Sequence, residues 1–202
     1  ERVLDVGCGC GDTSLQLAER VAPTGHVTGL DISEPMLAVA QRRAAEQGRQ
    51  DQVNFVLADA QTYEFEPASY DALFSRFGVM FFADPADAFA NLRSALKPGG
   101  RLAFVCWRPA AENGWMMVPF KAAVGLFPVP PAKTDPLAPG PFAFADAERV
   151  RGVLSEAGFS DIGIKPHNQS IGGHPLDHAV KLALKVGPLG AMLREQPDTD
   201  PA

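Results

Sequence analysis

The stretch from Val3 to Gly11 constrains the fold of this chain more than any other. It reads VLDVGCGCG, in which apolar residues and one carboxylate lead into glycine at every second position. A run with helical apolar spacing follows from Thr13 to Val21. Glycine accepts positive φ and has no Cβ to hold a ligand away from the backbone. This order is typical of a buried strand, a tight turn and a helix, which begin a nucleotide-binding βαβ unit.

The spacing and the charge of the turn indicate which ligand it suits. Gly7, Gly9 and Gly11 depart from the G-x-G-x-x-G spacing of dinucleotide-binding turns, whose helix N-terminus receives a pyrophosphate. Asp12 stands where the helix should begin, and a carboxylate there suits the helix dipole but repels a pyrophosphate. Asp5 adds a second negative charge. These residues favour a nucleoside with a cationic end, such as S-adenosylmethionine.

A second acidic position supports this interpretation. Asp31 ends the apolar run that begins at His26. An acidic residue about twenty positions beyond such a turn, at the end of the second strand, binds ribose hydroxyls in nucleotide-binding folds. On these two features alone, an ordinary βα turn without a ligand remains open.

Four segments in order carry a family resemblance: VLDVGCGCG, GLDIS, LADA and LKPGGRLAF. Their order and spacing resemble the class I S-adenosylmethionine-dependent methyltransferases. The chain is most similar in character to the small-molecule branch that includes the ubiquinone and menaquinone C-methyltransferases. The resemblance covers residues 1–108 well and 142–165 more loosely. These motifs are specific for the superfamily but not for an acceptor.

Strand patterns alternate with helix patterns, which predicts an α/β fold: a Rossmann-like, doubly wound, mostly parallel sheet with helices on both faces. Expected helices lie at about 13–22, capped by Asp12 or Thr13, at 34–47 after Ser33, at 85–96 after Asp84, at 146–157, and in a stretch ending near Val186. Expected strands lie at 3–6, 26–30, 52–57, 70–75, 101–107 and 160–166. The resemblance implies an N-terminal cap helix and a seventh strand, and neither is recognisable in this sequence.

Composition divides the chain into four parts. Residues 1–108 form the expected cofactor-binding core, and 142–190 form the C-terminal part of the same domain. Residues 109–141 are rich in proline around the apolar segment Trp115–Phe120. A lid or substrate wall is favoured there over a surface connection, because a solvated linker has no need of large apolar side chains. The acidic, proline-containing stretch 191–202 is expected to be a disordered tail.

Bulk properties narrow the function classes. A chain of 202 residues fits one domain with a core of its own. The formal net charge of −6 argues against a nucleic-acid partner, and no apolar run approaches the roughly 20 residues of a membrane span. Cys8, Cys10 and Cys106 suit neither a disulfide framework nor the usual zinc spacings. We therefore expect no metal site and a cytoplasmic setting; the oligomeric state stays open.

Open parallel sheets bind ligands at the carboxyl ends of their strands. By resemblance, Asp5 orders the turn and the methionine ammonium, often through water. Gly7, Gly9 and Gly11 pass under the methionine and ribose, and Asp31 takes the ribose hydroxyls.

Later strand ends complete the expected cofactor site. Ile32 and Met36 are expected to pack on the adenine. Asp59 is expected to accept from the adenine amino group while the Ala60 N–H donates to the ring, with a helix cap as the alternative role for Asp59. A further group is expected to border the methionine carboxylate and the transferring methyl: Ser75, Arg76 and Phe77. Arg76 is equally consistent with a surface charge or a substrate clamp.

The expected function is methyl transfer from S-adenosylmethionine to a small-molecule acceptor of apolar or aromatic character. Aligning two bound reactants accelerates such an in-line displacement, and a base is needed only for a protonated acceptor. No catalytic residue is assigned. His167, His174 and His178 are the available bases, but surface or structural roles are favoured.

Four aromatic residues could shape an acceptor pocket or pack in the core: Phe81, Phe82, Trp107 and Trp115. Core packing is favoured for Phe81 and Trp107.

Two other functions remain open. One is a non-catalytic S-adenosylmethionine-binding or regulatory protein of the same fold, and the other, less favoured, is a nucleotide-dependent oxidoreductase.

Overall fold

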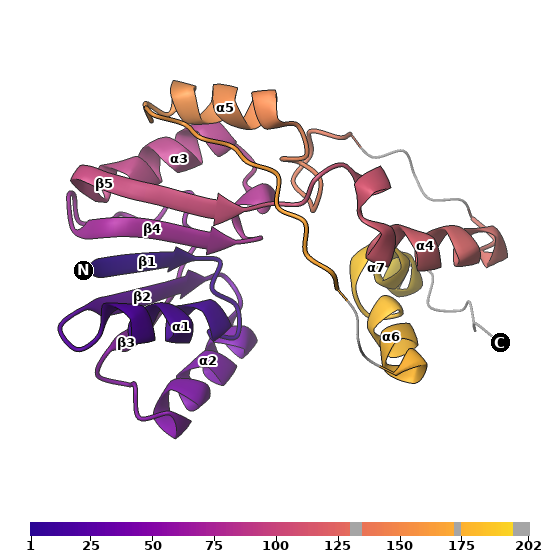
Figure 1. Cartoon of the computed structure of the whole chain (residues 1–202), viewed down its shortest axis with the longest axis horizontal. Coiled ribbons are helices and arrows are strands. Elements are labelled where there is room, and N and C mark those ends of the chain that lie inside the picture. The colour runs from indigo at the N-terminus through magenta and orange to yellow at the C-terminus, as the bar shows by residue number, and fades with distance from the viewer. Residues whose placement is uncertain (130–134, 172–174, 196–202) are drawn as a thin grey trace.

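The computed structural model describes residues 1–129, 135–171 and 175–195. Five parallel strands form one sheet in the order β3-β2-β1-β4-β5 (Figure 1). The strands are β1 (Arg2–Val6), β2 (His26–Asp31), β3 (Val53–Leu57), β4 (Tyr70–Arg76) and β5 (Leu96–Val105). This arrangement confirms the predicted Rossmann-like fold. Strand order reverses at β1, so the topological switch point lies between β1 and β4.

Helices cover both faces of the sheet. One layer contains α1 (Asp12–Val21) and α2 (Glu34–Glu46), and the other contains α3 (Pro85–Ser94) and α5 (Ala147–Glu156). The register neighbours Val3, Val27 and Val53 pack with the α1 side of the sheet, whereas Leu4 and Leu30 pack with the α3 side. Strands that are buried on both faces account for their near-continuous apolar sequences.

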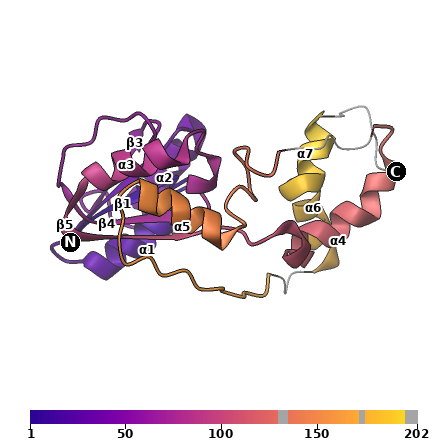
Figure 2. The ribbon, with the colours of Figure 1, turned by 90° about the horizontal axis from the view of Figure 1, so that it is seen from above.

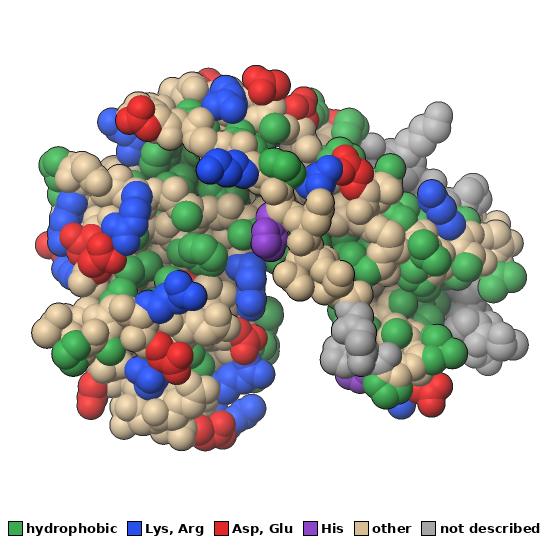
Figure 3. Space-filling model, viewed as in Figure 1, with side chains coloured by type: hydrophobic (Ala, Val, Ile, Leu, Met, Phe, Trp, Pro, Cys, Tyr) green, Lys and Arg blue, Asp and Glu red, His purple; other side chains and the backbone are tan. Residues whose placement is uncertain are grey.

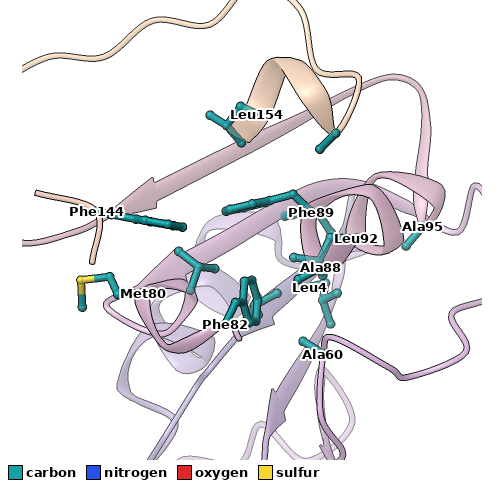
Figure 4. Close-up of a cluster of buried hydrophobic side chains, with 14 of the residues drawn as sticks. Leu4, Ala60, Met80, Phe82, Ala88, Phe89, Leu92, Ala95, Phe144 and Leu154 are labelled. Carbon is teal, nitrogen blue, oxygen red and sulfur yellow. The ribbon is translucent and has the colours of Figure 1, made fainter. Parts of the chain in front are cut away.

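Phe89 of α3 lies at the centre of the larger core (Figure 4). Its fully buried ring lies 5.7 Å from that of Phe82, 5.6 Å from that of Phe104 and 6.0 Å from that of Phe144, between ring centroids. Leu154 of α5 joins the same cluster. Residues late in the chain are therefore part of the core that the first hundred residues build.

Side-chain caps begin two of the helices, and the cap expected at the first helix is wrong. The Asp84 and Asp146 carboxylates accept from the N–H groups of Asp87 and Glu148 at the starts of α3 and α5. At α1 the N-cap position is taken by Gly11, in a left-handed conformation, so Asp12 and Thr13 lie inside the first turn instead of capping it. Ser33 holds the N-cap position of α2, but its side chain makes no capping hydrogen bond.

The segment from Lys97 to Gly100 differs from expectation. We expected it to end a helix and precede a strand, yet it forms the beginning of β5. The pairing of β4 with β5 shifts there: Tyr70 pairs with Leu96, and Ala72 pairs with Arg101. The additional residues bulge out of the ladder, and Gly99 permits this with φ +78°.

A separate group of helices lies beside the sheet (Figures 1 and 2). After η2 (Ala110–Glu112), the chain forms α4 (Gly114–Ala123) and η3 (Val124–Leu126). The late helices α6 (Leu176–Ala183) and α7 (Gly187–Glu195) pack against α4 around the buried side chains of Met116, Leu189 and Met192.

The late helices contact α4 more than the sheet. Residues 142–190 were expected as the C-terminal part of the same domain, and α6 and α7 within this range pack on α4. Residues 191–195 are helical, so that part of the expected tail is wrong, while 196–202 lie outside the described residues. Within the described ranges, no helix has both the length and the apolar character to cross a membrane.

The expected strand at 160–166 is also wrong. This stretch forms no ladder, and Asp161 interrupts it with φ +54°. A groove of about 1590 Å³ runs between β5 and residues 158–167. Alternating apolar residues do not make a strand unless another strand satisfies their backbone groups.

Candidate functional site

The carboxyl ends of the strands face the separate helical group (Figure 1). On the face drawn in Figure 3, the molecule is hollowed between these two parts. The turns that follow β1, β2, β3 and β4 lie at this edge of the sheet, which is where open parallel sheets bind ligands. The large groove along β5 lies on the lateral edge of the sheet and contains none of the expected cofactor residues.

The glycine turn after β1 is bound tightly to its neighbours. The N–H groups of Gly7 and Cys8 both donate to the carbonyl of Leu30, at 2.8 and 3.1 Å. A Cβ on Gly11 would lie 2.8 Å from the Cβ of Ala40. The absence of side chains at the turn therefore lets β1, β2 and α2 approach one another closely.

Asp31 anchors the turns after both β1 and β2. One carboxylate oxygen accepts from the Gly9 N–H at 2.8 Å, and the other accepts from the Ser33 N–H at 2.9 Å. Each carboxylate oxygen retains a further lone pair. Exposed apolar side chains stand beside this acid, with Ile32 74% exposed and Met36 42% exposed.

Asp5 lies in β1 directly before the glycine turn and is completely buried. Its Oδ2 accepts from the Ser14 hydroxyl at 2.7 Å, while Oδ1 has no hydrogen-bond partner among the described residues. Burial raises the pKa of Asp5 to about 6, an effect that the Ser14 hydrogen bond opposes. Asp5 is thus a desolvated carboxylate with one unpaired oxygen.

The loop after β3 presents an ordered carboxylate. Asp59 Oδ1 accepts from the Gln61 N–H at 2.9 Å, and the Gln61 amide Nε2 lies 3.2 and 3.1 Å from the two carboxylate oxygens. The Ala60 N–H has no hydrogen-bond acceptor within residues 1–129, 135–171 and 175–195. Leu57, at the end of β3, is 54% exposed and is a further apolar neighbour.

The end of β4 carries the residues expected near the methionine carboxylate. Ser75 is completely buried, and its hydroxyl donates to the Val6 carbonyl at 2.7 Å, so this side chain links β4 to β1. Its expected place beside the cofactor stays a prediction. Phe77 follows with φ +65°, a strained conformation for a residue with a side chain. Its ring stacks on Trp107, with centroids 4.1 Å apart and planes 8° apart.

Charge at the glycine turn is more balanced than the sequence indicated. Asp12 pairs with Arg43 at 3.0 Å and lies 4.0 Å from Arg76. Arg43 also donates to the Cys10 carbonyl. Two guanidinium groups thus offset part of the Asp12 charge, which weakens the argument that Asp12 repels a pyrophosphate.

Comparison with known proteins identifies the family. Residues 3–100 match a family described as a methyltransferase domain. A demethylmenaquinone methyltransferase of Thermus thermophilus is 33% identical over 174 residues, which cover 79% of this chain and 74% of that protein. This chain belongs to the class I S-adenosylmethionine-dependent methyltransferases.

Two further similarities bear on this methyltransferase. Aklanonic acid methyltransferase DauC of a Streptomyces species is 35% identical over 139 residues, which cover 69% of this chain and 57% of that protein. The structure of a Haemonchus contortus phosphoethanolamine N-methyltransferase, in complex with phosphomonomethylethanolamine and S-adenosylhomocysteine, is 29% identical with a TM-score of 0.57. That match covers 80% of this chain but 33% of the nematode protein. The methyltransferase thus spans part of the length of each relative.

The donor set at the sheet edge fits S-adenosylmethionine. This cofactor carries an ammonium and a sulfonium, two ribose hydroxyls and an adenine amino group. Asp5 offers a buried carboxylate with an unpaired oxygen, Asp31 offers free lone pairs, and Asp59 offers an ordered acceptor. Exposed apolar side chains at Ile32, Met36 and Leu57 suit an aromatic base.

The aromatic residues that could shape an acceptor pocket differ in their burial. Phe82 packs in the core, whereas Phe81 is 53% exposed, contrary to the core role expected for it.

The cysteine and histidine residues show no sign of metal binding in the described ranges. Burial raises the pKa of the Cys8 thiol to about 12, which agrees with a packing role. No cluster of metal-ligating side chains occurs in the described ranges. His167 is exposed, and His174 lies outside the described residues.

Sequence reasoning missed four polar residues that support this site: Ser14, Arg43, Gln61 and Asn91. The sequence could have indicated Ser14, because it is a small polar residue beside Leu15 and Ala18 on the buried face of α1. The sequence gives no indication of the other three, since their partners lie 22 to 33 positions away or depend on loop conformation.

Proposed function

We propose that this protein transfers the methyl group of S-adenosylmethionine to a small apolar or aromatic acceptor. The observation that carries the proposal is the convergence of Asp5, Asp31 and Asp59 from three adjacent strands of a methyltransferase fold. When bound, S-adenosylmethionine supplies a methyl group on a sulfonium, which an acceptor displaces in line. The protein accelerates this reaction chiefly by alignment.

Each strand end has a distinct role in this proposal. Gly7, Gly9 and Gly11 lie beneath the methionine and ribose. Asp5 stabilises the ammonium from beneath the turn, and Asp31 accepts from both ribose hydroxyls. On the other side, Arg76 attracts the methionine carboxylate and Phe77 borders the methyl group.

The adenine subsite lies between the ends of β2 and β3. Ile32, Met36 and Leu57 supply exposed apolar surface for the faces of the base. Asp59 accepts from the exocyclic amino group, and the Ala60 N–H donates to a ring nitrogen. Ser75 supports the site by linking β4 to β1 through its hydroxyl.

Aromatic side chains favour an apolar acceptor. Phe77, Trp107 and Trp115 form a continuous series from the end of β4 to α4, with 5.5 Å between the centroids of the two indoles. Phe81 adds exposed aromatic surface beyond β4. The names of two relatives, which act on demethylmenaquinone and aklanonic acid, agree with this acceptor class. The net charge of −6 favours a small molecule over nucleic acid.

The test is methyl transfer from labelled S-adenosylmethionine to three acceptors. Demethylmenaquinone and aklanonic acid represent the proposed class, and phosphoethanolamine serves as a small polar contrast. Transfer to at least one of the first two, and not to phosphoethanolamine, is expected. Transfer to phosphoethanolamine alone would contradict the apolar acceptor.

Calorimetric titration with S-adenosylhomocysteine and NADH accompanies this assay. Binding of S-adenosylhomocysteine without transfer to any acceptor would instead favour a non-catalytic cofactor-binding role. Binding of neither S-adenosylhomocysteine nor S-adenosylmethionine would refute the proposal.

A further inference from the structure

Gln61 connects the adenine-side loop to the loop before α3. Its amide oxygen accepts from the Ala83 N–H at 2.6 Å, and its amide nitrogen faces both oxygens of Asp59, at 3.2 and 3.1 Å. The backbone N–H of Gln61 also donates to Asp59 Oδ1, at 2.9 Å. One side chain therefore bridges a backbone donor and a carboxylate.

These contacts define the orientation of the Gln61 amide. If the amide were flipped, its NH₂ group would face the Ala83 N–H and its oxygen would face the Asp59 carboxylate. Both contacts would then join like partners, donor to donor and acceptor to acceptor. The NH₂ group must consequently face Asp59, and this holds the carboxylate in one rotamer with a free lone pair.

Asn91 of α3 holds the same loop through its side-chain amide. Its Nδ2 lies 3.1 Å from the carbonyl of Ala60, 3.4 Å from that of Gln61 and 3.0 Å from that of Tyr63. An amide nitrogen has two hydrogens to offer, and three carbonyl oxygens surround this one. Asn91 thereby connects the rigid core helix to the segment that carries Asp59 and Gln61.

We propose that Gln61 is a positioning residue for recognition of the adenine amino group, with Asn91 holding the loop in place. Asp59 is an acceptor, so it favours a donor such as the 6-amino group of adenine over the 6-oxo group of hypoxanthine. Gln61 supplies that preference by directing the carboxylate. This inference rests on the proposed cofactor role of Asp59 and identifies the residues that make it selective.

The test compares two ligands, S-adenosylhomocysteine and S-inosylhomocysteine, by titration calorimetry. Gln61→Glu replaces the NH₂ group with a carboxylate oxygen that repels Asp59, and Gln61→Ala removes the bridge. Each variant is expected to bind S-adenosylhomocysteine at least about tenfold more weakly, as for the loss of a hydrogen bond to a charged group. The preference for adenine over hypoxanthine is expected to narrow by a similar factor.

A structural role would give a different pattern. If Gln61 only stabilised the loop, the affinity for both ligands would fall by the same factor. The ratio of their dissociation constants would then remain that of the wild-type protein, and this result would overturn the inference. Gln16→Glu, on the exposed surface of α1, makes the same chemical change elsewhere and is expected to alter neither affinity.

Asn91→Asp directs a carboxylate at three carbonyl oxygens. It is expected to lower the affinity for both ligands by the same factor. Unchanged binding by this variant would overturn the role of Asn91. Failure of the wild-type protein to bind S-adenosylhomocysteine would refute the proposed function, and the inference with it. Wild-type binding with an unaltered ratio in the Gln61 variants would refute the inference alone.

Discussion

Gly7 and Gly78 pack backbone against backbone at the switch point of the sheet. A Cβ on Gly7 would lie 2.8 Å from the Cα of Gly78, and a Cβ on Gly78 would lie 2.7 Å from the carbonyl oxygen of Val6. The turns after β1 and β4 can therefore meet only without side chains at these two positions. This contact lies at the sheet edge where the cofactor is proposed to bind.

Gly7→Ala is expected to lower the free energy of unfolding by about 2–5 kcal/mol, because it combines a left-handed backbone strain with a steric clash. Gly48→Ala is the matched control. Gly48 has a similar φ of +64° but no atom within 4 Å of an added Cβ, so only the strain of about 1 kcal/mol is expected. Urea denaturation measures both. Equal losses would mean that contact with Gly78 contributes nothing.

Asp5 is expected to make stability fall with rising pH. Its folded pKa, about 6, lies above the ordinary value of 3.8, so the folded state binds the proton more tightly than the unfolded state. The contribution is greatest below pH 4 and is lost as pH rises through 6. A pKa difference of about 2 corresponds to about 3 kcal/mol.

Asp5→Asn should remove this dependence, since an amide oxygen still accepts from the Ser14 hydroxyl. Without cofactor, the variant is expected to be more stable than the wild-type protein at pH 7 and similar at pH 4. Its affinity for S-adenosylhomocysteine should be lower at pH 7, because the charge that stabilises the ammonium is gone. A variant that is less stable than the wild-type protein at pH 7 would contradict the raised pKa.

Asp31→Ala is expected to weaken the binding of S-adenosylhomocysteine at least about 100-fold, as measured by titration calorimetry. Two charge-assisted hydrogen bonds to the ribose are lost, and the Gly9 and Ser33 N–H groups lose their acceptor. Asp51→Ala, at an exposed position before β3, removes the same charge and should leave affinity unchanged. A small effect at Asp31 would exclude it from the ribose subsite.

Phe77→Gly separates backbone strain from ring stacking. The change relieves φ +65° but removes the stack on Trp107, and a net loss of about 1–3 kcal/mol is expected. Ala68→Gly relieves φ +51° at an exposed position and removes no ring contact, so it should raise the free energy of unfolding by about 1 kcal/mol. Thermal and chemical denaturation measure both. A stabilised Phe77→Gly would show that strain outweighs the stack.

Local sequence patterns were sufficient to predict the strands, turns and acidic residues that form the site. The glycine turn, the strand before it and the acid at Asp31 depend on neighbouring residues and on strand length, so their places could be predicted. The same holds for the order of strands and helices through α3, because hydrophobic periodicity is a local property. The cofactor class followed from these features together with the family resemblance.

Sequence reasoning fell short where the partner of a residue comes from elsewhere in the fold. It did not reveal that the Ser75 hydroxyl donates to Val6 of β1, the strand beside β4. Residues 160–166 have a strand-like pattern without a strand partner. Asp12 was read as an unbalanced charge, although Arg43 lies 3.0 Å from it across 31 positions of sequence.

The sequence by itself determined the α/β class, the glycine turn and the acids at the strand ends, because each depends on short-range pattern and backbone conformation. Only the tertiary structure decided that Gly7 meets Gly78, that Gln61 and Asn91 hold the Asp59 loop, and that α6 and α7 pack on α4. These contacts join residues far apart in the chain. Their energies arise from packing and hydrogen bonding that exist once the whole sheet has formed.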